Sequence, residues 1–450
     1  MIVLFLLLAI DLHASDDKQL NAQLSKKGTQ ITLIKKTYYI DNVVNIPANK
    51  KVNGNGSKLI FKNELIKQWA LTLNAGCSLS NLEIAGSNQS EEFNFVNNGA
   101  EAYRKFNFYY TPELLAVWLQ GDKISLNNIK INGCKKGIGG NATNVSLNQL
   151  NVKGSYACIE MYISKFIRVT NSTFYGGSFG CITFPSCSDI TVEKCMLYNP
   201  KSTGVNPGGA SSEAMTPRNI NVRYNTIIAG DCINLENGAI DVMISDNTIQ
   251  CAPIVDKTIN NSAIAVQVHD PKANSIIRNV TITRNHIVAY QDIMYGIGIN
   301  IGNILGNKIN QVVITNNTMS GGNEGIRVEN KKNFVADQVT ILNNNVICYA
   351  FGMRLFQVSN GTINNNTIRA YKSTWNDNLW GIQMHKCTNL TLNQNTTTGF
   401  MKHYYETEKS INVDIRKPNT QKGEVTKPYS VLFSDPSIPQ TNNKIRLRND

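Results

Sequence analysis

The sequence predicts an all-β protein in which one chain winds into a single-stranded parallel β-helix of about eleven or twelve coils with an N-terminal cap. Three observations predict this fold. Short segments rich in Ile, Val and Thr alternate apolar and polar residues. These segments recur at intervals that run from 21 residues, between positions 129 and 150, to 38 residues, between positions 247 and 285. No helical period of about ten residues or more fits between them.

The repeated segment carries asparagine at one fixed position. "VMISDNTI" (242–249) and "VTITRNHI" (280–287) show the pattern. The asparagines that share the position are Asn225, Asn247, Asn285, Asn317, Asn345, Asn366 and Asn395, and upstream it is occupied by Ile129, Leu150, Ser172 and Cys195. Coils of one chain stack about 4.8 Å apart with like residues above like, so we expect the asparagines to form an internal hydrogen-bonded ladder.

The strand before each ladder strand begins with a column of small residues. Its members are Cys158, Cys181, Gly204, Cys232, Ala263, Gly296, Gly325, Gly352 and Gly381. A column that accepts only small side chains is typical of a tight corner, so these three of the ten cysteines are expected to pack there rather than to form disulfides. The next column, from Ile159 to Ile382, is apolar and is predicted to point inward.

The two ends of the chain differ from the repeat. Residues 1–14 form a short apolar segment that predicts a signal peptide with cleavage after Ala14, and hence a secreted, periplasmic or cell-surface protein. No segment reaches the roughly 20 apolar residues of a membrane span. Residues 15–61 are predicted to be an N-terminal cap with the first strands, residues 62–402 the β-helix, and residues 403–450 a polar C-terminal tail.

Two features of the sequence indicate what kind of molecule the protein binds. The formal net charge of +12 favours a polyanion, and no nucleic-acid-binding signature is present, so an acidic polysaccharide is preferred to nucleic acid. The aromatic and basic segment 91–113 exceeds one period and is expected to be a long loop. This loop fits either the wall of a sugar groove or a segment packed on the coils.

The stretch "TYYIDNVVNIPANKKVNGNGSKLIF" (37–61) and the coils over about residues 30–400 resemble the pectin-lyase-like superfamily of right-handed parallel β-helices. This superfamily includes secreted polysaccharide lyases, glycoside hydrolases and phage tailspikes. The resemblance implies a right-handed helix with a substrate groove along one sheet. It also implies Ca²⁺ as a candidate cofactor, although no compact cluster of oxygen ligands demands it. Such rods commonly form trimers, and a homotrimer stays an open alternative.

One stretch, "AGDCINLENG" (229–238), is similar to the "GDDCIAIKSG" motif of polygalacturonases. Only Asp231 keeps a catalytic aspartate position, because Thr203 and Gly230 stand where the other two aspartates would be. Arg327 matches that family's arginine motif one coil late, and the histidine motif has no counterpart. The mechanism of polygalacturonases is therefore not expected here.

The outward side chains of the strands that carry the small column provide the candidate site. The substrate-binding candidates are Glu160, Tyr162, Asn234, Gln267, Asn300 and Gln383, and the catalytic candidates are Asp231, Glu236, His269, Arg327, Glu329, Arg354 and His385. The alignment places Gly298 beside Arg327 in the first outward column, and Asn300 beside Glu329 in the second. Carboxylates, guanidinium groups, amides and aromatic rings together are typical of sugar recognition.

Two chemistries follow from these columns. Elimination from a uronate needs a cation for the carboxylate, which Arg327 and Arg354 would supply, and a base such as His385. A pair formed by Glu236 and His269 is a second candidate centre. Hydrolysis needs two carboxyl groups about 5–9.5 Å apart, whereas Glu236 and Glu329 lie three coils, roughly 14 Å, apart. Asp231 and Glu236 stand at opposite ends of one strand and are also expected to be distant from each other.

The sequence therefore favours an exported polysaccharide lyase that acts on an acidic, uronate-containing polysaccharide. A glycoside hydrolase or a C5-epimerase on the same fold stays open, since the epimerase shares the first step of elimination. A non-catalytic adhesin or glycan-binding protein also stays open. For single residues, a surface salt bridge between Arg327 and Glu329 and a merely packed His385 are the structural alternatives.

Overall fold

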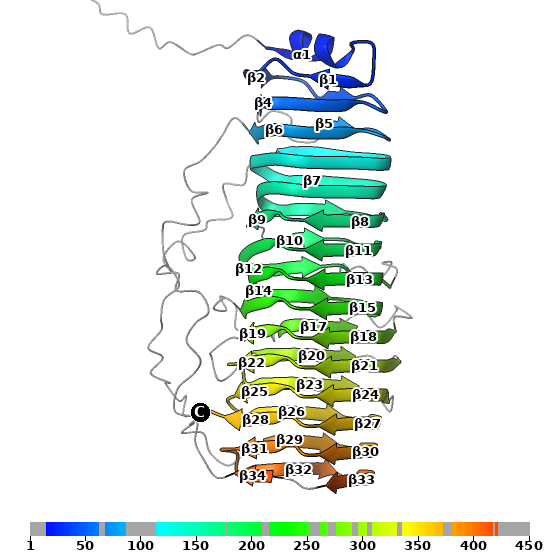
Figure 1. Cartoon of the computed structure of the whole chain (residues 1–450), viewed down its shortest axis with the longest axis vertical. Coiled ribbons are helices and arrows are strands. Elements are labelled where there is room, and N and C mark those ends of the chain that lie inside the picture. The colour runs from blue at the N-terminus through cyan, green and yellow to red at the C-terminus, as the bar shows by residue number, and fades with distance from the viewer. Residues whose placement is uncertain are drawn as a thin grey trace, which may run out of the picture.

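The computed structural model describes residues 15–62, 68–86, 114–176, 179–208, 216–251, 262–268, 276–289, 296–303, 308–330, 335–371, 380–416 and 419–421. These residues form a right-handed parallel β-helix whose coils stack in chain order, from helix α1 (Asp17–Leu24) at one end to strands β33 and β34 at the other (Figure 1). The predicted all-β solenoid is confirmed. The predicted signal peptide (1–14) and loop (91–113) lie outside the described residues.

Each coil contributes one short strand to each of three faces, and every pair of neighbouring strands is parallel. Face 1 contains β1 (Gln30–Thr32), β8 (Lys165–Thr170), β11 (Ser188–Glu193), β13 (Arg218–Arg223), β15 (Ala239–Ser245), β18 (Ile277–Thr283), β21 (Ile309–Thr315), β24 (Ala336–Leu342), β27 (Val358–Asn364), β30 (Thr388–Asn393) and β33 (Ile411–Arg416). Face 2 contains β2 (Thr37–Ile40), β9 (Thr173–Tyr175), β16 (Thr248–Cys251), β19 (His286–Val288), β22 (Thr318–Ser320), β25 (Asn345–Cys348), β28 (Thr367–Ala370), β31 (Thr396–Thr398) and β34 (Asn419–Gln421).

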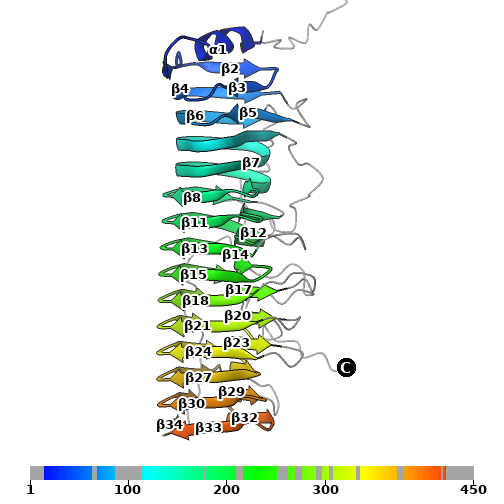
Figure 2. The same cartoon turned by 90° about the vertical axis from the view of Figure 1, so that its right-hand side faces the viewer.

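Face 3 contains β3 (Val44–Ile46), β5 (Trp69–Leu73), β10 (Gly180–Thr183), β17 (Ser262–Val268), β20 (Ile297–Asn303), β23 (Glu324–Asn330), β26 (Phe351–Phe356), β29 (Trp380–His385) and β32 (Lys402–Glu408). Five longer strands continue around a corner: β4 (Lys51–Phe61), β6 (Ser78–Gly86), β7 (Leu115–Met161), β12 (Met196–Asn206) and β14 (Thr226–Leu235). Figure 2 shows face 1 and face 3 on opposite sides of the stack.

The described residues give face 1 fifteen levels, because β4 and β6 each add one level to its eleven strands and β7 adds two. This number exceeds the eleven or twelve coils that the sequence predicted. The early coils carry no asparagine at the ladder position, and strands β32 to β34 extend the helix beyond residue 402. At the other end, Leu20 and Leu24 of α1 are buried on the first coils.

The asparagine ladder is confirmed, with one correction. Each ladder asparagine donates from Nδ2 and from its backbone N–H to Oδ1 of the asparagine one coil on, at 2.8–3.1 Å. Between Asn317 and Asn366 the member is Asn344, not Asn345, whose slot was miscounted within "NNN". The preceding residue turns the chain through positive φ, as at Asp246 with φ of 57°, which Asn and Asp tolerate.

The small column lies at the corner that leads into face 3. A Cβ atom added to Gly352 would lie 2.4 Å from the carbonyl oxygen of Gly381 on the next coil, so even the methyl group of alanine would force the chain to shift at this position. In the coil of β20 the column member is Gly298, which pairs with Gly325, and not Gly296. The ten cysteines are all buried free thiols, and burial raises the pKa of Cys187 and Cys195 to about 12.

Candidate functional site

The first outward column of face 3 is more deeply buried than a binding surface would be. It runs through Glu160, Thr183, Asn206, Asn234, Ala265, Asn300, Arg327, Arg354 and Gln383. Asn234 is 5% exposed, Asn300 8% and Gln383 3%. Asn300 thus belongs to the first column, beside Arg327, and not to the second beside Glu329, because the coil of β20 is shifted by two residues from the predicted alignment.

The second outward column is partly accessible and contains Glu236, Gln267, Glu329, Phe356 and His385. Glu236 follows β14 directly and its carboxylate accepts two amide N–H groups, from Asn206 Nδ2 at 3.3 Å and from Asn234 Nδ2 at 3.0 Å. Asn234 in turn accepts from Gln267 Nε2 at 3.0 Å. Three predicted residues, Glu236, Asn234 and Gln267, therefore form one hydrogen-bonded group that fixes the position of the Glu236 carboxylate.

Asp231 lies at the start of the face 3 part of β14, where Thr203 of the preceding coil is its direct neighbour. Burial raises the pKa of Asp231 to about 6, and the carboxylate of Glu236 adds to the increase, although the Ser262 backbone N–H donates to Oδ1 at 3.0 Å and opposes it. The carboxyl group is enclosed enough for burial to dominate its pKa, while the residue as a whole is half-buried. One coil thus carries a proton-retaining acid and a hydrogen-bonded carboxylate, an arrangement typical of acid–base catalysis.

The predicted arginine pair forms a different contact from the one expected. Both Arg327 and Arg354 donate to Glu324, whose side chain is 4% exposed, and the Arg354 Nη1 to Glu324 Oε1 distance is 2.7 Å. Arg354 Nε also donates to Gln383 Oε1 at 3.0 Å, and Glu329 lies 3.9 Å from Arg327. The two guanidinium groups are therefore already neutralised by carboxylates.

Glu324 was missed by the sequence analysis. It stands next to the small column, where the two-residue alternation of the strand does not assign a direction to the side chain. Its acidic side chain stands three residues before Arg327, and this spacing was the one sign in the sequence that the two could form an ion pair. Burial lowers the pKa of Arg327, but the hydrogen bonds to Glu324 outweigh it and the net shift is upward.

His385 lies near the C-terminal end of face 3. Its Nδ1 is 2.9 Å from the hydroxyl of Thr407, its Nε2 is 3.7 Å from Glu408, and its ring centroid is 5.1 Å from that of Phe356. His385 thus contacts the Arg354 cluster through Phe356, whose ring lies 4.9 Å from the Arg354 guanidinium. His269, the predicted partner of Glu236, lies outside the described residues.

At the N-terminal end of the same face, Glu160 is buried and forms an ion pair with Lys136. Tyr162, 37% exposed, hydrogen-bonds Glu160, and burial together with this carboxylate raises the pKa of the phenol. The predicted candidates Glu160 and Tyr162 are therefore in contact with each other. They lie three coils from Glu236, through β10 and β12, so they belong to a different part of the face.

Aromatic rings stack along the edge by which the chain enters face 3. Tyr156 and Phe179 lie on successive coils with centroids 5.2 Å apart and planes 3° from parallel, and Lys136 Nζ is 5.0 Å from the Tyr156 centroid. Near the other end, Trp380 of this edge stacks at 4.4 Å with Tyr405, which pairs with Gln383 in the first outward column. The edge was not among the predicted site residues, because Tyr156, Phe179 and Trp380 precede the small column.

The part of the chain that the structure describes contains no group of three or more His, Cys, Asp or Glu side chains placed to hold a metal ion. Within the same residues, no helix is both long and apolar enough to cross a membrane.

Comparison with known proteins gives structural neighbours only. No family model and no curated protein matches the sequence. PfbA, a surface protein and adhesin of Streptococcus pneumoniae, is 13% identical over 90% of this chain and 97% of its own, with a TM-score of 0.44. The A-module of the mannuronan C-5 epimerase AlgE6 of Azotobacter vinelandii is 10% identical, with coverage of 90% and 96% and a TM-score of 0.39. A hyperthermoactive exopolygalacturonase of Thermotoga maritima is 11% identical, with coverage of 84% and 87% and a TM-score of 0.41.

The described residues form the 34-stranded parallel sheet of the β-helix that the sequence predicts. The function has to be argued from the residues of the site.

Proposed function

We propose that this protein is a carbohydrate-active enzyme that binds a polysaccharide along face 3 and hydrolyses it with Asp231 and Glu236. The observation that carries the proposal is the contrast between these two carboxyl groups on one coil. Asp231 keeps its proton up to a pH of about 6, whereas Glu236 accepts hydrogen bonds on both oxygens. Glycoside hydrolysis requires one carboxyl group of each kind, at short range. Although the sequence places the two residues at opposite ends of one strand, the Glu236 carboxylate contributes to the raised pKa of Asp231, which supports their proximity.

In this mechanism Asp231 donates its proton to the glycosidic oxygen of the departing sugar. Glu236 acts from its ionised form, either on a water molecule or on the sugar carbon itself. The amides of Asn206 and Asn234 hold the Glu236 carboxylate in place on the outward side of the sheet. These two amides are positioning residues, because they act through Glu236.

Elimination, which the sequence favoured, is less well supported by the contacts. It needs a cation that is available to neutralise a uronate carboxylate, and both predicted arginines already donate to Glu324. Their partly buried side chains would have to leave this carboxylate to bind a substrate. The ion pairs therefore favour a structural role for Arg327 and Arg354.

The proposal includes an acidic polysaccharide as substrate and export of the protein. The net charge of +12 supports a polyanionic substrate, and the apolar segment at residues 1–14 supports export to where such polymers occur. Both parts depend on the sequence. The substrate panel tests the first, and cell fractionation after expression of the full chain tests the second.

The test is to incubate the purified protein with polygalacturonate, alginate, hyaluronate and a neutral β-glucan, while reducing ends and the ultraviolet absorbance of unsaturated uronates are followed together. We expect reducing ends to rise without the absorbance. Asp231→Asn and Glu236→Gln should each lower kcat by about 10²–10⁴-fold, and Asp337→Asn on face 1 should leave it unchanged. A rise in absorbance would show elimination instead, and binding without any product would show a glycan-binding protein.

A further inference from the structure

The entry edge of face 3 contains a stack of side chains that ends close to Asp231. Tyr156 and Phe179 occupy equivalent positions on successive coils, since Ala157 pairs with Gly180. On the next coil the equivalent position holds Ser202, because Gly180 pairs with Thr203. The aromatic stack therefore gives way to a short polar side chain one coil beyond Phe179.

Asp231 lies on the coil after Ser202. Thr203 pairs with Asp231 in the register of β12 and β14, so Phe179 and Asp231 belong to coils two steps apart. Two steps correspond to about 9.5 Å along the helix axis. The level between them carries Ser202 and Thr203, whose side chains are much smaller than an aromatic ring, so among the described residues no ring stacks on this side of Phe179.

The Ser202 side chain is directed toward the preceding coil by a hydrogen bond. Its hydroxyl donates to the carbonyl oxygen of Phe179 at 2.9 Å, so its side chain points back to the preceding coil. Thr203 is buried, and its carbonyl oxygen accepts from Asn199 Nδ2 at 3.0 Å. Between Asn199 and Thr203 the register of β12 against β14 shifts, so the chain bulges beside Asp231.

We propose that Phe179 is the aromatic platform of a sugar-binding subsite, in which a pyranose ring of the polysaccharide stacks on the phenyl ring at the level of Ser202 and Thr203. The C–H groups of one pyranose face carry partial positive charge and pack on the negative face of an aromatic ring. The ring bound there presents its glycosidic oxygen toward the level of Asp231. Tyr156 supports the platform from behind by parallel stacking.

This inference rests on the proposed function, because it assigns Phe179 to the same polysaccharide and the same acid. The Phe179 ring provides a surface for the apolar face of the sugar, which the carboxylates of Asp231 and Glu236 cannot provide. Phe179 would raise affinity and position the bond that is cleaved, without taking part in the chemical step.

The test uses Phe179→Ala and Phe179→Tyr, with Tyr224→Ala as a matched control, since Tyr224 is an exposed ring at another corner. Binding to polygalacturonate and alginate is measured by affinity electrophoresis in the Glu236→Gln background, and kcat and KM are measured in the wild-type background. We expect Phe179→Ala to weaken binding and raise KM about 10-fold, and Phe179→Tyr and the control to bind like wild type.

A second variant, Ser202→Phe, extends the aromatic stack by one coil and should block the subsite. Its binding is expected to fall at least as far as that of Phe179→Ala, while the thermal unfolding midpoints of both stay close to that of wild type. Unchanged binding in both variants overturns the subsite. If Asp231→Asn stays active while Phe179→Ala binds weakly, the hydrolytic mechanism fails and the subsite stands.

Discussion

The Glu324 carboxylate on β23 lies 2.7 Å from Arg354 Nη1 on β26, so one buried acid joins two neighbouring coils. Arg327 donates to the same carboxylate from within β23. Three charged side chains thus share a site in which the Glu324 side chain is 4% exposed and the two arginines are partly buried. The pairing satisfies each group, and removal of the shared acid would leave two cations without their strongest partner.

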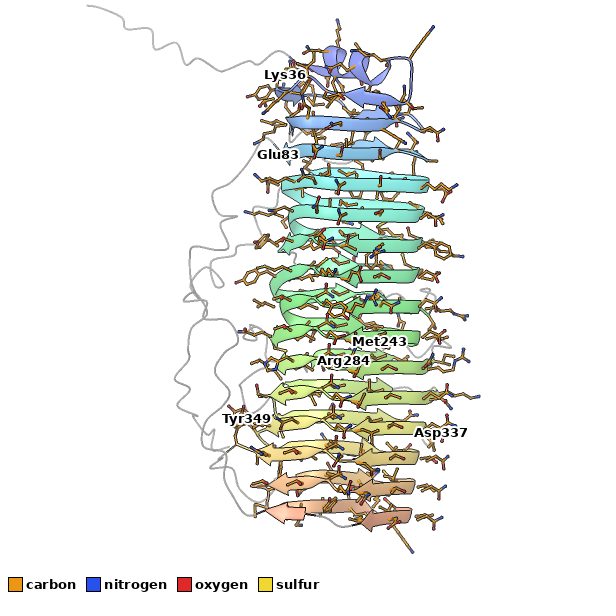
Figure 3. The ribbon with its side chains drawn as sticks, in the orientation of Figure 1. Lys36, Glu83, Met243, Arg284, Asp337 and Tyr349 are labelled. Atoms are coloured by element: carbon orange, nitrogen blue, oxygen red, sulfur yellow. The ribbon has the colours of Figure 1, made fainter. Side chains whose placement is uncertain are left out.

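Glu324→Gln is therefore expected to destabilise the protein by about 3 kcal/mol, because both arginines stay buried after the carboxylate is lost. Chemical denaturation at neutral pH measures the change. Glu83→Gln is the matched control. Glu83 also lies between two cations, Lys58 and Lys130, but it is 26% exposed and labelled near the N-terminal end in Figure 3, so its loss should cost less than about 1 kcal/mol. Equal losses would contradict the burial argument.

The raised pKa of Asp231 predicts a pH-dependent gain in stability for Asp231→Asn. The folded protein holds this proton up to a pH of about 6, whereas the unfolded chain releases it near 3.8. Wild-type stability therefore falls as pH rises from about 4 to about 6, and Asn, which mimics the protonated acid, avoids the loss. We expect no difference at pH 3.5 and a gain of up to about 3 kcal/mol at pH 7.5.

Asp246→Asn provides the control of opposite sign. Two hydrogen bonds from Arg284, at 2.7 and 2.9 Å, lower the pKa of Asp246, so its contribution is present at neutral pH and lost on acidification. Arg284, labelled in Figure 3, is exposed, and the effect should stay below about 1 kcal/mol. A pH-independent difference for Asp231→Asn would show that its pKa is not raised.

Asn317→Ala should destabilise the helix by about 2–4 kcal/mol. The substitution removes the acceptor for Asn285 Nδ2 and N–H and the donor to the Ile282 carbonyl oxygen, all in a buried position. Thermal unfolding followed by circular dichroism measures the loss. Asn310→Ala on face 1 removes one weak contact to Asp337 at 3.4 Å and should change stability by less than about 0.5 kcal/mol. Similar values for the two variants would rule out the ladder as a source of stability.

The ten buried thiols predict that the native protein resists thiol reagents. We expect no reaction of the folded protein with Ellman's reagent and ten reactive thiols after unfolding in denaturant without reductant. Burial raises the pKa of thiols such as Cys187, which also slows their oxidation. Fewer than ten thiols after unfolding would reveal a disulfide, and the unfolding temperature would then depend on reductant.

The sequence predicts the fold well, because each coil repeats the same local requirements. The ladder position and the small column each require a particular kind of residue in every coil. Asn247 satisfies a buried turn, and Gly352 leaves room for a neighbouring carbonyl oxygen. The register failed only where the repeat is ambiguous. In "GIGINIG" (296–302) two frames fit the pattern, and the correct one places Asn300 beside Arg327.

The site was only partly predictable. The alternation of strand residues correctly grouped Asn234, Glu236 and Gln267, since Asn234 and Gln267 lie in regular strands and Glu236 directly follows one. It missed Glu324 and Phe179, which stand at the corner where the alternation breaks down. It also overestimated the exposure of the first column, because amides stacked on successive coils cover one another.

The ladder occupies only part of the rod. From Asn225 to Asn395 the turn is held by amide-to-amide hydrogen bonds, whereas upstream the equivalent contacts come from Ser172 and Cys195 or are replaced by Leu150. Each coil contacts mainly its neighbours, so a change of turn chemistry changes the local free energy of opening. Asp231 lies close to this boundary. The candidate acid thus lies near the boundary between the coils without the asparagine ladder and the coils with it. We expect backbone amides to exchange faster before residue 225 than after it, which hydrogen exchange would measure.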